Sequence, residues 1–230
     1  MASTSSPPPP LDATSTSEIV DMGGHGGWLA TVFSALALGF SGFSFYESVL
    51  KVAELEVYVP PVIHYARDAG GDIELFAIPI TILNDGARTG TVLSMDLAVE
   101  DLKEKKTKLY YSAYLGEHPR ASETAQRAFA PASISGKATY SETVRFYPVG
   151  NPLPKLVQDA GQFRLTLKLN TARPANPDLI DRLWRTEPAP LIFEMTLPWI
   201  SDQQLDHRRA AMAMHQPDYR PLGSAEAPAK

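Results

Sequence analysis

The stretch LNDGARTGTV, residues 83–92, comes nearest in this sequence to a phosphate-binding loop. Two glycines, Gly86 and Gly90, enclose Arg88 and Thr89. A Walker-type loop needs Gly-Lys-Ser/Thr before a helix, and a dinucleotide fingerprint needs three glycines at a helix start. Here Gly90 opens a strand pattern, so no helix N-terminus is available to hold an anion. The stretch therefore favours a turn between two strands, with Arg88 exposed and able to contact a partner or a lipid headgroup.

Other residues that could take part in catalysis or metal binding are scattered along the chain. The five histidines show neither helix-face spacing nor an HExxH pattern: His25, His64, His118, His207 and His215. The chain has no cysteine, which excludes disulfides, Cys-ligated zinc and a thiol nucleophile. The nearest approach to a GxSxG serine motif is GFSG, which lies inside an apolar run. We therefore expect no catalytic, metal-binding or cofactor-binding residue, and the net charge of −5 disfavours nucleic acid as a partner.

The segment YVPPVIHYARD, residues 58–68, allows two interpretations. In one, His64, Tyr65 and Arg67 line a recognition surface. In the other, two short strands flank a proline-fixed bend, and Tyr65 helps to close the core. Together with Arg88, the residues His64, Tyr65 and Arg67 are the candidate surface contacts of this sequence.

An uncharged apolar run, WLATVFSALALGFSGFSFY, occupies residues 28–46. As a helix it would be roughly 28 Å long, close to the hydrocarbon thickness of a bilayer. Trp28 and Tyr46 stand at its ends, where aromatic rings favour the headgroup level. A buried core helix would carry a polar stripe. A cleaved signal peptide would carry basic residues, and the first fifty residues contain no Lys or Arg. The sequence therefore predicts one transmembrane helix over residues 28–50.

One face of this helix carries small side chains, because Thr31, Ala35, Gly39 and Gly42 follow one another at helical spacing. Small residues let two helix backbones approach closely. We expect this face to pack on a second copy or on another membrane protein. The first basic residue after the run is Lys51, so the positive-inside rule slightly favours a cytoplasmic domain, with a periplasmic domain as the alternative.

Beyond the apolar run the hydrophobic period becomes two, which is typical of strands. Seven strands are predicted, within residues 54–61, 72–83, 90–101, 108–116, 137–149, 161–171 and 190–199. Helical patterns cover residues 152–161 and 176–185, too few for the crossovers of a parallel sheet. We therefore expect a mainly β domain over residues 52–200, an antiparallel immunoglobulin-like sandwich. A capping-box signature predicts a C-terminal helix over residues 201–215. The polar segments 1–27 and 216–230 are predicted to be disordered.

Two stretches carry a family resemblance: LEVYVPPVI (55–63) and ILNDGARTGTVLSMDLAVE (82–100). With the preceding apolar run, residues 28–200 resemble bacterial inner-membrane proteins of unassigned role, in which one span precedes an Ig-like sandwich. The resemblance implies a single-pass bacterial inner-membrane protein and transfers no site residue. The leading hypothesis is a membrane-anchored, non-catalytic interaction or assembly module, such as an accessory subunit of a membrane complex. The alternatives are a hydrolase or lyase with its site at the sandwich loops, and a sandwich that binds lipid or another apolar ligand.

Overall fold

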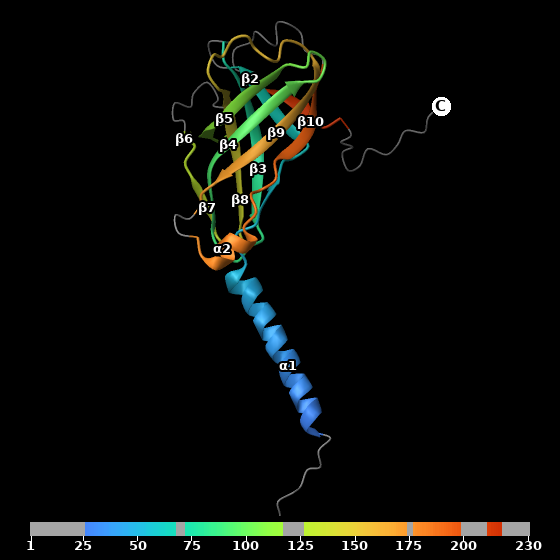
Figure 1. The fold of residues 1–230 in the computed structure, drawn as a ribbon. Coiled ribbons are helices and arrows are strands. Elements are labelled where there is room, and N and C mark those ends of the chain that lie inside the picture. The colour runs from blue at the N-terminus through green and yellow to red at the C-terminus, as the bar shows by residue number, and fades with distance from the viewer. Residues whose placement is uncertain (1–25, 68–71, 117–126, 174–176, 199–210, 218–230) are drawn as a thin grey trace, which may run out of the picture. The chain divides into compact units, whose positions relative to one another are not determined.

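The computed structural model describes residues 26–67, 72–116, 127–173, 177–198 and 211–217. The chain divides into two units, of which the first ends at Ser44 and the second begins at Phe45. The described part of the first unit belongs to α1 (Gly26–Phe45), a continuous helix of 20 residues (Figure 1). Its described side chains are all exposed, and with the following turn it is long and apolar enough to cross a membrane. Signal sequences share this property.

After Phe45, the second unit continues with a π-helical turn, Tyr46–Leu50, and then a mainly β domain. Its strands are β1 (Leu55–Tyr58), β2 (Val62–Arg67), β3 (Glu74–Asn84), β4 (Gly90–Asp101), β5 (Thr107–Leu115), β6 (Arg127–Ala128), β7 (Ala132–Ile134), β8 (Thr139–Pro148), β9 (Gly161–Thr171), β10 (Leu191–Leu197) and β11 (Met212–His215). A short helix, α2 (Leu179–Trp184), precedes β10. Each of the seven predicted strands therefore has its counterpart.

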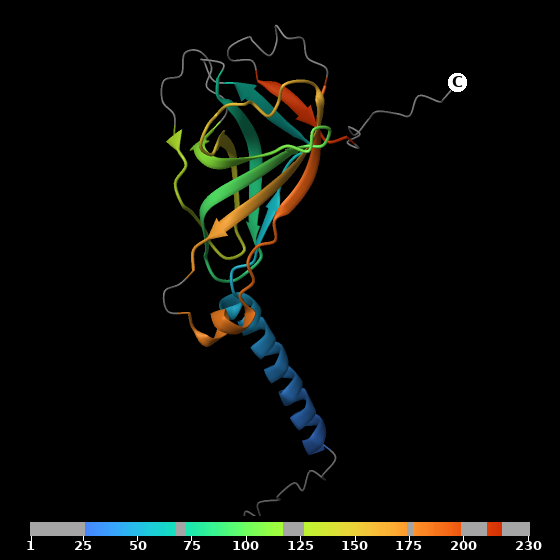
Figure 2. The same ribbon diagram turned by 45° about the horizontal axis from the view of Figure 1, so that its top comes forward.

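The expected two-layer sandwich is wrong, because eight antiparallel strands close into a barrel. Their order is β5-β8-β3-β2-β11-β10-β9-β4, and β4 pairs again with β5. Figure 2 shows the strands wrapping around a common interior. Closure removes the free sheet edges that a sandwich keeps. Strands β1, β6 and β7 add to the outside of this ring, on β3, β5 and β4.

The predicted C-terminal helix over 201–215 is also wrong in its described part, because Met212–His215 form β11. Residues 201–210 lie outside the described chain. The sequence AMAMH is rich in helix formers, but Met214 is fully buried and β11 pairs with β2 along four residues. This pairing outweighs a weak local preference. Of the two short helical patterns, 176–185 contains α2, whereas 152–161 has no helix.

Pro79 lies in the middle of β3 without interrupting its ladder to β8, in which it stands opposite Thr143. On the other side of β3, the pairing with β2 ends at Ala77 and the pairing with β1 begins at Thr81. Pro79 therefore occupies a short unpaired stretch of that edge, where a missing N–H costs no ladder bond.

Candidate functional site

The loop between β3 and β4 contains Gly86, and Gly90 opens β4. This loop attaches residues 51–54, the entry segment that precedes β1, to the barrel. Its centre is Asn84, whose side chain is fully buried. The Asn84 Oδ1 atom accepts from the Gly86 and Glu54 amides at 3.0 and 3.2 Å. The Nδ2 group donates to the carbonyls of Arg88, Ile134 and Ser135 at 2.8–3.1 Å. One amide side chain thus joins the entry segment to the β3–β4 loop and to the loop that follows β7. We call this set of bonds the Asn84 clamp.

Gly86 is required by close packing. A Cβ atom at this position would overlap the carbonyl oxygen of Val52. Two further bonds hold the same segment, since the Ala87 and Arg88 amides donate to the Lys51 carbonyl at 3.0 and 3.1 Å. The turn interpretation of this stretch is confirmed by the structure, and the backbone groups of the turn are directed at the entry segment.

Replacing Asn84 with alanine is expected to lower the free energy of unfolding by about 2–4 kcal/mol, because buried backbone donors and acceptors lose their partner. Thermal or urea unfolding of the full chain in detergent measures this change. The Asn84→Asp variant is a close control, because it keeps the acceptor oxygen but replaces the donor Nδ2 group with an oxygen that faces three carbonyl oxygens. It should be destabilised as well. An Asn84→Ala protein as stable as wild type would show that the clamp is dispensable.

Ion pairs reinforce this clamp on its exposed side. The Lys51 Nζ atom lies 2.8 Å from Asp85 and 3.2 Å from Glu54, and the Lys137 Nζ atom lies 3.0 Å from Asp85. Hydrogen bonds from Lys51 and then Lys137 lower the pKa of Asp85 to about 2. The bond from Lys51 to Asp85 in turn raises the pKa of that lysine. The charges of this cluster are therefore mutually satisfied.

Arg88, predicted to be an exposed contact, is directed at α2. Its Nη1 atom lies 2.8 Å from an oxygen of Asp178 and 3.3 Å from an oxygen of Asp181. The guanidinium group thereby ties the β3–β4 loop to α2. Asp178 also caps the helix, accepting from the Asp181 amide at 2.8 Å.

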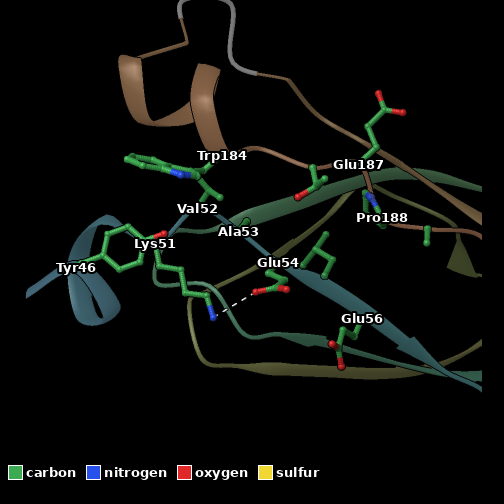
Figure 3. Close-up of a pocket in the computed structure, with 12 residues that line it drawn as sticks. Tyr46, Lys51, Val52, Ala53, Glu54, Glu56, Trp184, Glu187 and Pro188 are labelled. Carbon is green, nitrogen blue, oxygen red and sulfur yellow. Dashed lines mark ion pairs between the residues drawn. The ribbon is translucent and has the colours of Figure 1, made fainter. Parts of the chain in front are cut away.

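A cleft of about 400 Å³ opens beside β1 (Figure 3). Tyr46 and Trp184 stand at one end, and Glu54, Glu56 and Glu187 line its length. In the described part of the chain β1 pairs with β3 alone, so the opposite edge of β1 has no strand partner. Acidic side chains, with one lysine, Lys51, paired to Glu54, therefore border an unpaired strand edge.

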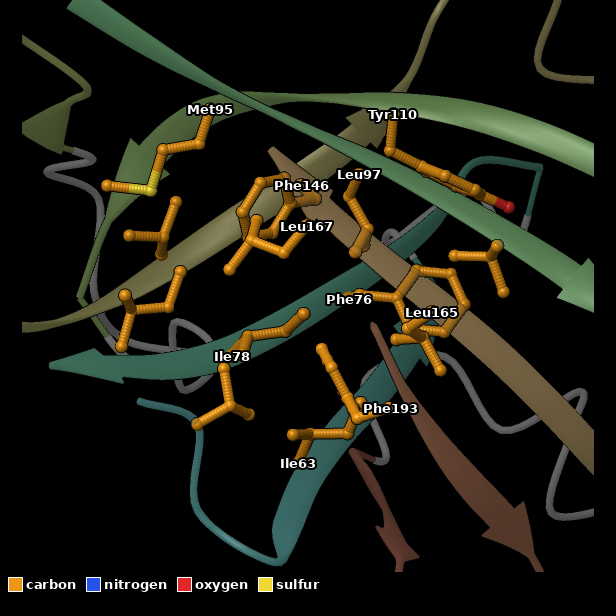
Figure 4. Packing of buried hydrophobic residues seen from close by; sticks show 14 of the residues in the cluster. Ile63, Phe76, Ile78, Met95, Leu97, Tyr110, Phe146, Leu165, Leu167 and Phe193 are labelled. Atoms are coloured by element: carbon orange, nitrogen blue, oxygen red, sulfur yellow. The ribbon is translucent and has the colours of Figure 1, made fainter. Parts of the chain in front are cut away.

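The barrel interior, in contrast, is filled by side chains. Phe76 and Phe146 are fully buried there among aliphatic residues (Figure 4), and Phe163 is buried in the same cluster. Phe76 packs edge to face on Tyr65 and Tyr110, at centroid distances of 5.4 and 5.0 Å. An apolar ligand in the interior, as the lipid-binding hypothesis requires, would have to displace these rings.

The predicted contacts of the 58–68 segment are separated by the alternation of β2. His64 is exposed, opposite Ala77 and Ala213 on the neighbouring strands. The prediction that Tyr65 and Arg67 belong to a surface is wrong, because both side chains are buried. The second interpretation of this segment, two short strands around a proline bend, matches β1 and β2.

Tyr65 and Arg67 belong instead to a buried polar network around Glu74. The carboxylate of Glu74 accepts from the Tyr110 hydroxyl at 2.6 Å, the Lys108 ammonium at 3.0 Å and the Leu156 amide at 2.9 Å. The Tyr65 hydroxyl lies 3.4 Å from the same carboxylate, and burial, followed by the charge of Glu74, raises the pKa of Tyr65 and Tyr110. This network ties the loop after β8 to the barrel, and every oxygen of Glu74 is used in doing so.

The remaining predicted residues lie on α1. Thr31, Ala35, Gly39 and Gly42 are exposed along the helix, and apart from the neighbouring helix backbone no described atom lies within 4 Å of a Cβ placed on either glycine. The Thr31 hydroxyl donates to the Gly27 carbonyl at 2.9 Å, which satisfies it within the helix. Within the described residues, no three His, Asp or Glu side chains are grouped closely enough to hold a metal.

Comparison with known proteins gives weak structural matches and no family. No protein-family model and no curated protein matches the chain. Among solved structures, a candidate late embryogenesis abundant (LEA) protein aligns at a TM-score of 0.36 and 17% identity, over 76% of this chain and 89% of its own. The candidate ApaA protein of Bordetella pertussis aligns at 0.27 and 17%, over 74% and 98% of the two chains. Scores of this size carry no conclusion about fold, activity or partners.

Proposed function

We propose that this protein is a membrane-anchored, non-catalytic interaction module. Its α1 helix is the anchor, and the cleft beside β1 receives an extended segment of another membrane protein. The unpaired edge of β1 carries this proposal, because such an edge offers backbone donors and acceptors to an added strand. The clamp at Asn84 supports it, since the clamp keeps β1 and its approach in a fixed conformation.

The charge of the cleft favours a basic partner segment. Glu56 is exposed and, among the described residues, forms no ion pair, so a Lys or Arg can approach it without displacing another cation. Segments that flank transmembrane helices on the cytoplasmic side are rich in Lys and Arg. We therefore favour the bacterial inner membrane as the location, a cytoplasmic barrel, and a partner that offers its own membrane-flanking segment.

The α1 helix supplies a second contact in this proposal. Its small face, formed by Thr31, Ala35, Gly39 and Gly42, is open along its described length. A partner span or a second copy can approach that face closely, as small residues permit. Binding at the cleft and packing at the helix would then act on one partner, and each would raise the effective concentration of the other.

A labelled eight-residue peptide of alternating Lys and Val is expected to bind the full-length protein in detergent, as measured by fluorescence anisotropy. An alternating Glu and Val peptide should not bind, because the cleft is acidic. The Glu56→Lys variant should weaken binding of the basic peptide on the order of tenfold, since an attraction becomes a repulsion. A basic peptide with alternate backbone nitrogens methylated should bind less well, because strand addition needs those N–H groups.

The matched control is Asp72→Lys, which makes the same charge change at an exposed position just before β3. It should leave peptide affinity unchanged at fixed ionic strength. Equal losses in Glu56→Lys and Asp72→Lys would indicate attraction to overall charge, and would contradict a site at β1.

A further inference from the structure

We propose that α2 is an interfacial helix that lies on the lipid bilayer, with Leu179, Leu183 and Trp184 immersed among the headgroups and upper acyl chains. This inference rests on the membrane anchoring proposed above and adds a second membrane contact, made by the barrel unit itself. Its starting point is an apolar surface that α2 exposes: these side chains are 71%, 63% and 55% accessible.

The orientation of α2 is the reverse of that expected for a surface helix in water, whose apolar side should face the core. Its acidic side is used to attach it. The Asp181 side chain is only 16% exposed and contacts Arg88 at 3.3 Å and Arg185 at 3.8 Å. With its carboxylates bound to the domain, the helix holds Leu179 and Leu183, one turn apart, away from it.

The position of Trp184 identifies lipid as the occupant of this surface. Its ring packs edge to face on Tyr46, at a centroid distance of 6.1 Å and an interplanar angle of 72°. Tyr46 directly follows α1 in the chain and belongs to the apolar segment that can cross a membrane, Gly27–Leu50. If that segment spans a bilayer, Tyr46 lies four residues before its end at Leu50, and the ring contact keeps Trp184 close to the depth of Tyr46.

The chemistry of α2 suits that level. Tryptophan and tyrosine concentrate at the bilayer interface, where the ring is among apolar groups and the polar atom remains hydrated. Leucines on the same helix can enter the acyl boundary, and the exposed Arg182 can contact lipid phosphates. The bilayer surface would thereby also fix the height of the cleft that Trp184 borders.

Tryptophan quenching in vesicles tests this inference. The full-length Trp28→Phe, Trp199→Phe variant keeps Trp184 as its only tryptophan and is reconstituted in phosphatidylcholine and phosphatidylglycerol vesicles. One vesicle set carries lipids brominated near the headgroup end of the acyl chain. We expect Trp184 to lose roughly half or more of its emission there, and to be protected from aqueous acrylamide. Adding Leu179→Ser and Leu183→Ser should reduce the quenching by bromine.

The control moves the tryptophan to Leu109, in a chain that also carries Trp184→Phe. Leu109 is 57% exposed and pairs with Ala98 of β4. Ala98 lies eight residues after Gly90, the first residue of β4, and these eight residues span roughly 27 Å along the strand. The emission of a tryptophan at position 109 should be insensitive to brominated lipid. Vesicle flotation separates the two claims. Protein that floats while Trp184 remains open to acrylamide overturns the interfacial helix alone, whereas protein that does not float overturns the anchor and the inference together.

Discussion

The double substitution Leu36→Lys, Leu38→Lys in the middle of α1 is expected to move the protein from the membrane fraction to the soluble fraction. Each lysine at the centre of a membrane helix disfavours insertion by about 2.5–3.5 kcal/mol, and the leucine it replaces favours insertion. Both leucines are exposed in the structure, and the apolar segment has no buried residue. The substitutions should therefore leave the fold of the second unit intact. Carbonate extraction and flotation measure the change.

The matched control places the same two charges on the barrel, at the exposed residues Leu109 and Ile192. That variant should remain in the membrane fraction. The intact mass of the membrane-bound wild-type protein distinguishes an anchor from a signal sequence, because a signal sequence would be removed. Full extraction of the wild-type protein by carbonate, or a mature chain shortened by cleavage, would contradict the proposal that α1 is a membrane anchor.

Replacing Glu74 with alanine is expected to cause the largest loss of stability, about 3–5 kcal/mol, because it leaves a partly buried cation and buried donors without their partner. Lys108 is 14% exposed and would lose its carboxylate, although it would keep the carbonyls of Pro152 and Pro154. The amides of Leu156 and Val157 would lose their acceptor altogether. Chemical unfolding of the full chain in detergent gives this free energy.

Two variants calibrate that measurement. Glu74→Gln keeps the size and one acceptor and should lose less than Glu74→Ala. Glu104→Ala removes the partner of Lys106 in an exposed pair 2.8 Å apart, and it should leave the free energy of unfolding nearly unchanged because water screens such pairs. If Glu74→Ala and Glu104→Ala were equally mild, the buried network would not be what secures the loop after β8.

The strands of this domain could be predicted because alternation is a local property. Phe163, Leu165 and Leu167 alternate with polar residues, and all three are buried in β9. Barrel closure could not be predicted, since the same alternation suits a sandwich. It depends on pairs such as Leu97 with Tyr110 and on the docking of β11, whose alanines and methionines resemble a helix.

The candidate site was harder to predict because its parts come from distant positions. The turn chemistry of Asn84 and Gly86 was visible in the sequence, but their contacts with residues 51–54 were not. Arg88 was predicted to contact a partner or a lipid headgroup, whereas in the structure its guanidinium group pairs with two carboxylates of the same chain, Asp178 and Asp181. The cleft joins residues 46–56 to 184–189, a pairing that no local pattern indicates.

Site-specific photocrosslinking in native membranes tests the membrane-anchored binding module most directly. A benzophenone amino acid replaces Thr186, at the exposed border of the cleft, or Leu109 on β5 as the control. We predict one discrete adduct from position 186, resistant to carbonate extraction, with the crosslink mapped to a basic segment that flanks a partner span. The adduct should be lost with Glu56→Lys. No adduct at position 186, or the same adduct from position 109, would contradict a binding site beside β1.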